Sequence, residues 1–305
     1  MGRRKKGNPV HGWVVFDKPL TMTSTQAVGK VRWLFQAQKA GHGGTLDPLA
    51  TGILPIALGD ATKTVPFTMD ASKSYEFTIQ WGENRDTLDA EGIVTETSDV
   101  RPSETDIKAV ICEFTGEISQ IPPKYSAIKV DGKRAYDLAR GGEEVTLKAR
   151  PVRVDSLELL NSTTETATFR LNCGKGTYVR SLARDLAARL GACGYVSYLR
   201  RTRVGEFDES CAFSLDDLEN LCHRGGVLEA LAPVHAVLDD IPVQNVTENE
   251  VSDLRQGRAI AASVFHNLSE KKDEPEWVLA MKNDVAIALC HLRDGQLRPK
   301  RVFNV

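Results

Sequence analysis

The spacing of apolar residues divides the first part of the chain into strands and helices. Residues 12–16 are apolar almost throughout and predict a buried strand, which Asp17-Lys-Pro interrupts. Thr23 or Ser24 can cap a following helix, because positions 28, 31, 34 and 35 are apolar at helical spacing. Residues 75–81 alternate between apolar and polar, the pattern of a strand with one buried face, typical of an antiparallel sheet.

The same pattern continues to the C-terminus. Ser103 can cap a helix over about 103–114, residues 127–130 resemble a strand before the tight turn Asp131-Gly132, and 151–173 alternate as strands. Leucines at 182, 186 and 190 predict an amphipathic helix over 178–190, which Gly191 ends. The acidic stretch 206–240 is expected to be helical. After Pro242, strand-like pieces at 277–281 and 285–289, separated by the charged segment 269–276, predict a small β-rich unit.

Composition restricts the class of protein. With 305 residues, 41% of them hydrophobic and 26% charged, the chain can bury a sizeable core in one large domain with an appendage, or in two domains. No apolar run is long enough for a signal-peptide core or a membrane span, so a cytoplasmic protein is expected. The six cysteines lie far apart without a C-x-x-C pair, which indicates buried thiols and neither a zinc site nor a disulfide framework.

Charge is distributed unevenly, although the net charge is only −2. Residues 1–50 hold eight Lys/Arg against two acidic residues, and residues 170–205 hold eight against one. Residues 206–256 hold twelve Asp/Glu against two arginines and make the total negative. The two basic segments are compatible with a bound polyanion such as RNA and equally with a solvated surface of mixed charge.

A glycine-rich loop between residues 41 and 52 contains the first candidate for chemistry, Asp47. An aspartate before proline is commonly a turn or a helix N-cap. Four glycines in twelve residues also remove side-chain bulk, so that a large ligand can approach the backbone. His42 lies in the same loop. No glycine loop has the form that holds a nucleotide cofactor.

Eight motifs follow one another between about residues 11 and 205. They are Asp17-Lys-Pro, the loop 41–59, Lys73-Ser-Tyr, Asp86-Thr-Leu-Asp, Ile121-Pro-Pro-Lys-Tyr-Ser-Ala-Ile-Lys, Gly132-Lys-Arg-Ala-Tyr, Gly174-Lys-Gly-Thr-Tyr-Val-Arg and Tyr198-Leu-Arg-Arg-Thr-Arg. These motifs and their order resemble those of the TruB family of tRNA pseudouridine synthases. Gly43 stands where many members of the family have threonine, and the segment after about 240 matches the family only loosely.

The resemblance implies the fold and the activity. The expected fold is α/β (α+β), the pseudouridine synthase fold, with a central mixed, largely antiparallel sheet flanked by helices. A catalytic domain is expected at 11–240 and a small β-rich, PUA-like RNA-binding domain at 241–305. The implied reaction is isomerisation of uridine to pseudouridine at position 55 in the T-loop of tRNA, by a monomer that binds the T-arm stem-loop and uses no metal or organic cofactor.

The resemblance also assigns the site residues. Asp47 is implied to be the nucleophile, which must be ionised, and Arg180 the fixed cation that keeps it charged. Tyr75 is implied to stack on the flipped uracil and to accept a proton late in the reaction. His42 would fill the gap left by the extruded base. Tyr178 and Leu199 would line the uracil pocket.

Each assignment has a simpler alternative in the residue pattern alone. Arg180 can be a helix-surface charge, Tyr75 an ordinary strand-face aromatic, and His42 a loop histidine with a local hydrogen bond. Tyr178 and Leu199 can be core residues. Two rival functions also remain: a tRNA-binding folding chaperone with secondary catalysis, and an isomerase of the same chemistry that acts on ribosomal RNA.

Overall fold

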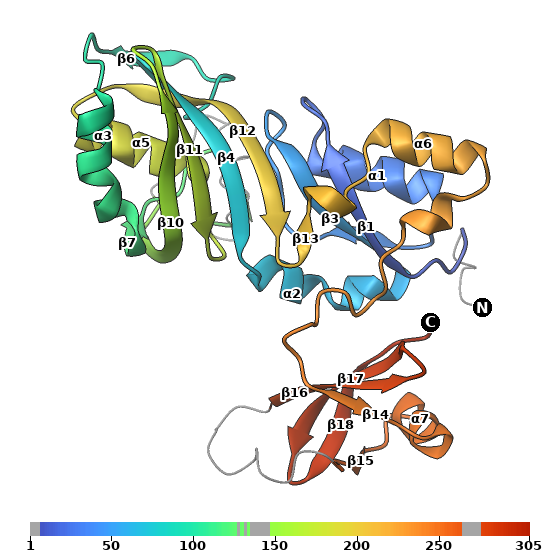
Figure 1. The fold of residues 1–305 in the computed structure, drawn as a ribbon. Coiled ribbons are helices and arrows are strands. Elements are labelled where there is room, and N and C mark those ends of the chain that lie inside the picture. The colour runs from blue at the N-terminus through green and yellow to red at the C-terminus, as the bar shows by residue number, and fades with distance from the viewer. Residues whose placement is uncertain (1–6, 127–128, 131–132, 135–146, 264–275) are drawn as a thin grey trace.

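One large mixed sheet organises the first 210 residues or so (Figure 1). The computed structural model describes residues 7–126, 129–130, 133–134, 147–263 and 276–305. The nine strands follow the order β1-β3-β12-β4-β11-β10-β7, with β2 paired to β3 and β13 paired to β12. Among the described strands of this sheet, β3 and β12 pair in parallel and the other pairs are antiparallel, so the sheet is largely antiparallel as expected. The strands are β1 (Gly12–Lys18), β2 (Ala40–His42), β3 (Thr51–Leu58), β4 (Lys73–Trp81), β7 (Gly116–Gln120), β10 (Arg150–Ser162), β11 (Thr166–Cys173), β12 (Gly194–Val204) and β13 (Phe207–Asp208).

Helices pack at both ends of this sheet (Figure 1). At one end, α3 (Glu104–Val110) contacts β10, and α5 (Val179–Arg189) contacts β4 and β12. At the other end, α1 (Ser24–Leu34) contacts β3, and α6 (Leu215–His223) contacts β1. Shorter elements complete the unit: η1 (Gly59–Lys63), α2 (Val65–Asp70), η2 (Ile111–Phe114), η3 (Glu209–Cys211), η4 (Val227–Ala230), and the strand pairs β5 (Glu83–Arg85) with β6 (Val94–Thr97) and β8 (Lys129–Val130) with β9 (Lys133–Arg134).

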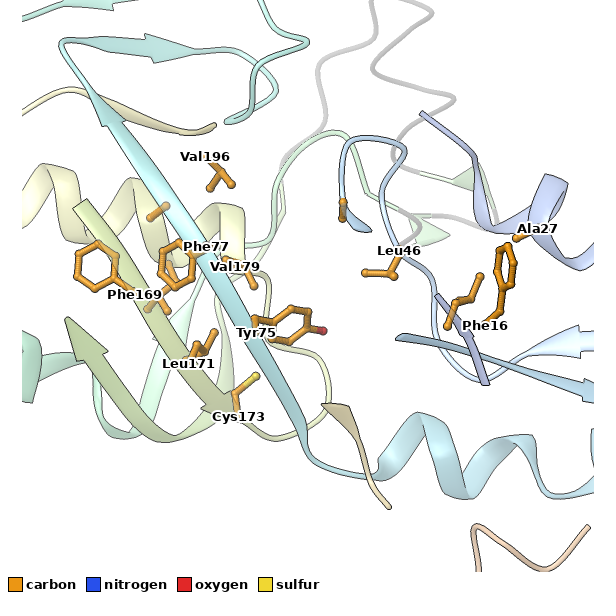
Figure 2. Packing of buried hydrophobic residues seen from close by; sticks show 14 of the residues in the cluster. Phe16, Ala27, Leu46, Tyr75, Phe77, Phe169, Leu171, Cys173, Val179 and Val196 are labelled. Atoms are coloured by element: carbon orange, nitrogen blue, oxygen red, sulfur yellow. The ribbon is translucent and has the colours of Figure 1, made fainter. Parts of the chain in front are cut away.

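Local sequence explains the best predicted elements. Thr23 is the N-cap of α1, where its side chain accepts a hydrogen bond from the Gln26 N–H. The apolar positions of β4 are all buried, and the ring of Phe77 stacks on that of Phe169 in β11 at 5.2 Å between centroids. This cluster fixes the middle of the sheet, and Figure 2 shows Tyr75 at its edge, with the hydroxyl directed toward the loop that carries Leu46.

A second, five-stranded sheet follows, in the order β14-β16-β17-β18-β15, and it has a core of its own. It packs against η1 and α2 of the first unit. Lys63 Nζ donates to the Val302 carbonyl at 2.6 Å, and the Asn304 N–H donates to Asp60 Oδ2 at 2.6 Å. Its elements are β14 (Val243–Asn245), α7 (Glu248–Arg255), β15 (Ile260–Ala261), β16 (Glu276–Lys282), β17 (Val285–Arg293) and β18 (Gln296–Val302).

The structure corrects two expectations. The acidic stretch 206–240 is helical only over α6 and the short turns η3 and η4, because Gly225, at φ +77°, and Gly226 follow the end of α6 and Pro233 interrupts the remainder. Strand β3 was missed, because Pro55 lies in the middle of it; the strand is nevertheless central and almost entirely buried. The turn expected at 131–132 and most of the charged segment 269–276 lie outside the described residues.

Candidate active site

The loop that carries Asp47 connects the adjacent antiparallel strands β2 and β3. The Ala50 N–H donates to the Asp47 carbonyl at 3.1 Å, so Asp47-Pro48 begins a turn and does not cap a helix. The buried Ser24 hydroxyl donates to the Leu46 carbonyl at 2.9 Å and accepts from the Leu46 N–H at 2.8 Å. The first residue of α1 therefore fixes the backbone immediately before Asp47.

Two buried cations, Lys18 and Arg201, donate hydrogen bonds to backbone carbonyls of the same loop. Lys18 Nζ donates to the carbonyls of Pro19, Met22 and Pro48 at 2.9, 2.7 and 3.3 Å. Burial lowers the pKa of Lys18 from 10.5 to about 8, a shift that the nearby negative charge of Asp47 partly offsets. The ammonium group of Lys18 thus forms hydrogen bonds with backbone carbonyls in place of water, and one of these bonds reaches the loop at Pro48.

Arg201 of β12 is the second of these cations and is 2% exposed. Its guanidinium donates to the Ile53 carbonyl at 2.8 Å, to Gly44 at 3.1 Å and to Thr45 at 3.3 Å. Gly52 has φ +98°, and a Cβ there would lie 2.2 Å from the Arg201 carbonyl oxygen. Only glycine allows β3 to approach β12 this closely.

Asp47, the predicted nucleophile, and Arg180, its predicted cation, lie in contact in the structure. Arg180 Nε lies 2.9 Å from Asp47 Oδ2, and the guanidinium is buried whereas the side chain of Asp47 is 37% exposed. The Nε–H is not directed at any acceptor, so the contact is a close ion pair and not a well-aligned hydrogen bond. Arg180 is therefore no helix-surface charge.

Three further acceptors fix the guanidinium of Arg180 from other segments. Its Nη1 donates to the Thr87 carbonyl at 2.8 Å and lies 3.3 Å from Asp89 Oδ2, and its Nη2 donates to the Tyr125 carbonyl at 2.9 Å. Asp89 is itself held by the Thr87 hydroxyl at 2.6 Å. The arginine thus lies between two carboxylates and has little freedom to follow Asp47 if the loop moves.

A cavity of about 320 Å³ opens above this ion pair. Of the predicted site residues, five line it, and His42 does not. The size falls in the range of roughly 300–1,000 Å³ that small-molecule sites occupy. Its lining residues are Gly44, Thr45, Leu46, Asp47, Met69, Lys73, Tyr75, Ser126, Gly174, Gly176, Thr177, Tyr178, Val179, Arg180, Leu199 and Arg201.

The two tyrosines of the cavity, Tyr75 and Tyr178, lie in different environments. Burial raises the pKa of the Tyr75 phenol above its ordinary value, and Arg201 offsets only part of the rise, so the hydroxyl stays protonated at neutral pH. Tyr178 is the residue before α5. Its N–H donates to Gln120 Oε1 at 2.8 Å, its carbonyl accepts from Gln120 Nε2 at 3.2 Å, and the Arg150 guanidinium lies 5.2 Å from its ring centroid.

His42 lies at the end of β2, outside the cavity. Its Nδ1 accepts from the Gly44 N–H at 3.4 Å, which is the local hydrogen bond that the simpler alternative predicts. Burial, with the charge of Arg201, lowers the pKa of His42 below 6.5, so the ring is neutral near pH 7.

Five polar residues near Asp47 were not singled out from the sequence: Lys18, Lys73, Asp89, Ser126 and Arg201. All five lie within the recognised motifs, and a count of polar residues in those motifs would have included them. All five are buried in the structure, although polar and charged residues are mostly exposed in proteins, so their residue types alone do not predict this burial. Within the ranges that the structure describes, no helix is at once long enough and apolar enough to span a bilayer.

Comparison with known proteins shows the family of the chain. The family model of the TruB family pseudouridylate synthase N-terminal domain matches residues 32–179, and that of the tRNA pseudouridylate synthase B C-terminal domain matches residues 180–239. The tRNA pseudouridine synthase B of Caulobacter sp. (strain K31) is 54% identical over 309 residues, covering 100% of both chains. That of Bradyrhizobium diazoefficiens is 51% identical over 311 residues, covering 99% of this chain and 88% of the relative.

Solved structures share the fold. One, described as a crystal structure of a Cbf5-Nop10-Gar1 complex, has a TM-score of 0.72 and 25% identity, and the match covers 95% of this chain and 84% of the other. Another, an H/ACA RNP bound to a substrate RNA, has a TM-score of 0.73 at 23% identity, covers 100% and 92% of the two chains, and shows the fold alone.

The fold and the site together define an isomerase of the pseudouridine synthase class, whose substrate is RNA. Within that class, the chain belongs to the TruB family, the family of tRNA uridine isomerases.

Proposed function

We propose that this protein converts uridine 55 in the T-loop of tRNA to pseudouridine, with Asp47 as the nucleophile. The observation that carries the proposal is the ionised pair at the base of the cavity, Asp47 Oδ2 and Arg180 Nε at 2.9 Å. The reaction breaks the C1′–N1 bond, forms a C1′–C5 bond, releases the C5 proton and leaves N1 protonated, without net redox change. Attack on the ribose carbon and attack on the base both start from this carboxylate oxygen.

The walls of the cavity suit a flipped nucleotide. Extruding a base from a stacked loop costs a few kcal/mol, and stacking on one aromatic ring returns ~1–3 kcal/mol. Tyr75 lines the cavity beside Tyr178 and Leu199, and we assign the stacking to its ring. Because the Tyr75 phenol keeps its own proton, we assign it to stacking first, and it can accept the C5 proton only while releasing its own.

The mouth of the cavity suits an RNA backbone. A second hollow shares Gly174 with the cavity and is lined by Arg153 and Lys175, whose side chains are 72% and 67% exposed. Arg153 pairs with Asp155 and Lys175 with Asp70, so a bound phosphate would replace these carboxylates. Exposed cations of this kind bind phosphates and make affinity sensitive to salt. We propose that the T-arm stem-loop lies across this surface.

Two structural proposals complete the function. We propose that the protein acts as a monomer, with the cavity formed by Asp47, Tyr75, Tyr178, Arg180 and Leu199 as its active site. The separate five-stranded sheet after residue 241 supports its expected role as a small RNA-binding domain beside the catalytic domain 11–240.

Mass-spectrometric mapping of pseudouridine tests the substrate and the position. A tRNA transcript, a T-arm hairpin and fragments of ribosomal RNA are each incubated with the purified protein and compared with untreated RNA. The proposal expects one new pseudouridine, at position 55 of the transcript and at its equivalent in the hairpin. Modification of the ribosomal fragments without modification of the hairpin would contradict it.

A further inference from the structure

Three buried side-chain polar atoms lack a hydrogen-bond partner within the described ranges: Trp81 Nε1, Ser126 Oγ and Arg180 Nε. Two of these three residues, Ser126 and Arg180, line the same cavity. A buried hydroxyl without a hydrogen-bond partner destabilises the folded state, and folded proteins rarely retain one without a reason. Arg180 Nε already lies 2.9 Å from the carboxylate of Asp47. The Ser126 hydroxyl, in contrast, lacks a partner among the described residues and belongs to a residue that lines the cavity, which points to a ligand that supplies the missing partner.

Neighbouring serines show how unusual Ser126 is. The buried Ser181 hydroxyl donates to the Ile121 carbonyl at 2.8 Å, and Ser24 bonds both backbone groups of Leu46. Ser126 is 5% exposed, a burial similar to theirs, but its hydroxyl has no such bond among the described residues. Its hydroxyl therefore has no observed role in holding the free protein together.

The backbone places Ser126 at a fixed position relative to the nucleophile. The carbonyl of the preceding residue, Tyr125, accepts from Arg180 Nη2 at 2.9 Å, and the same guanidinium lies 2.9 Å from Asp47. Two buried prolines, Pro122 and Pro123, restrict the segment further. One rotamer step of a serine is enough to direct its hydroxyl at a ligand oxygen.

We infer that the hydroxyl of Ser126 donates a hydrogen bond to an oxygen of the flipped nucleotide. This inference rests on the proposed function of the cavity. The nucleotide offers two kinds of acceptor there, the uracil carbonyls and the ribose 2′-hydroxyl. Ser126 is thus a substrate-contacting residue, beside the residues of the ion pair.

The test compares Ser126→Ala with wild type in the full-length protein. The variant loses only an unpartnered hydroxyl, so its thermal unfolding midpoint stays the same or rises. Its kcat/KM for the target uridine falls by about 3- to 10-fold, the effect of one neutral hydrogen bond. A fall in the midpoint, or an unchanged kcat/KM, would overturn the inference.

Two serine variants serve as controls. Ser24→Ala removes a hydroxyl that bonds the backbone, so its unfolding midpoint falls. Ser162 lies at the far end of β10, twelve residues beyond Arg150, whose guanidinium donates to the carbonyl of the cavity residue Gly176. Ser162→Ala should therefore change neither the unfolding midpoint nor kcat/KM.

A second comparison identifies the acceptor and separates this inference from the proposed function. Affinity is measured with hairpins that carry uridine or 2′-deoxyuridine at the target. If Ser126→Ala binds the uridine hairpin more weakly than wild type but binds the 2′-deoxyuridine hairpin equally well, the partner is the 2′-hydroxyl. If it binds both hairpins more weakly than wild type does, the partner is the base. Should wild type modify a uridine other than position 55, the proposed position fails, and the serine is then tested on the uridine that wild type does modify.

Discussion

Replacing Arg201 by methionine should affect both the stability of the fold and the placement of the nucleophile. Methionine keeps much of the aliphatic volume but has no donor. The carbonyls of Gly44, Thr45 and Ile53 would then each lose a hydrogen bond, and the first two belong to the loop that carries Asp47. The variant therefore tests whether the loop depends on a cation from a strand 156–157 residues further along the chain.

The expected magnitude follows from the bonds. Leaving a buried acceptor unsatisfied costs about 1–3 kcal/mol, and the two longer bonds lie near the lower end. The variant also no longer has to bury a charged guanidinium, which offsets part of the summed cost of the three unsatisfied carbonyls. We therefore expect the free energy of unfolding to fall by about 3 kcal/mol. A shift of about 1 Å at Asp47 would lower kcat about 100-fold, while tRNA affinity, which depends on the surface cations, changes little.

Urea denaturation measures the first effect, and release of tritium from C5 of the target uridine under single-turnover conditions measures the second. Arg203→Met is the matched control on the same strand. Its three contacts, to Ser74, Gly205 and Ser72, are 3.3–3.4 Å long and only partly buried, so it should lose less than about 1 kcal/mol. If Arg201→Met were as stable and as active as Arg203→Met, the proposed support of the loop would be wrong.

Three further predictions concern the same site. Arg180→Met should lower kcat more than tRNA affinity, because it leaves the carboxylate of Asp47 without its cation; equal losses would indicate a phosphate contact instead. Gly52→Ala should abolish most activity and destabilise the fold, since the added Cβ meets a backbone oxygen at 2.2 Å, as denaturation and activity assays would show. Lys73 has a pKa lowered to about 8 by burial, so the folded state loses its proton first, and its contribution to stability rises as the pH increases from about 8 to 10.5. Relative to Lys73→Met, wild type should therefore gain about 2 kcal/mol in urea denaturation between about pH 7.5 and about pH 9.5.

The controls for these predictions come from the same chain. Gly29→Ala lies in α1 with open space around its Cβ, so it should stabilise the fold by about 0.5–1 kcal/mol and leave activity unchanged. A Gly52→Ala variant that behaves like Gly29→Ala would contradict the close approach of β3 and β12. An identical pH dependence of wild type and Lys73→Met would contradict the assigned shift.

Elements with strong local periodicity were predictable from the sequence. Helices α1 and α5 and strand β4 follow directly from apolar spacing and caps, because each has one buried face. β3 was missed because a proline is an unfavourable signal for a central strand. Periodicity also gave no order of strands, since pairing depends on contacts between distant segments.

The candidate site was predictable only through resemblance. The motifs pointed to Asp47 and Arg180, which are 133 positions apart, and the structure places them in contact. The sequence did not reveal the buried cations that bond the loop carrying Asp47. Lys18 and Arg201 look like surface charges in a basic segment, and only the folded chain shows that backbone carbonyls have replaced their water.

Asp47→Asn tests the central claim most directly. The amide has the size of the carboxylate but no charge and no nucleophilic oxygen, so pseudouridine at the target uridine should not rise above the level in untreated tRNA. Affinity for tRNA should stay within about threefold of wild type, because the surface cations remain. Mapping of the tRNA by mass spectrometry after incubation decides the matter: pseudouridine formed by the Asp47→Asn protein would contradict the assignment of Asp47 as the nucleophile.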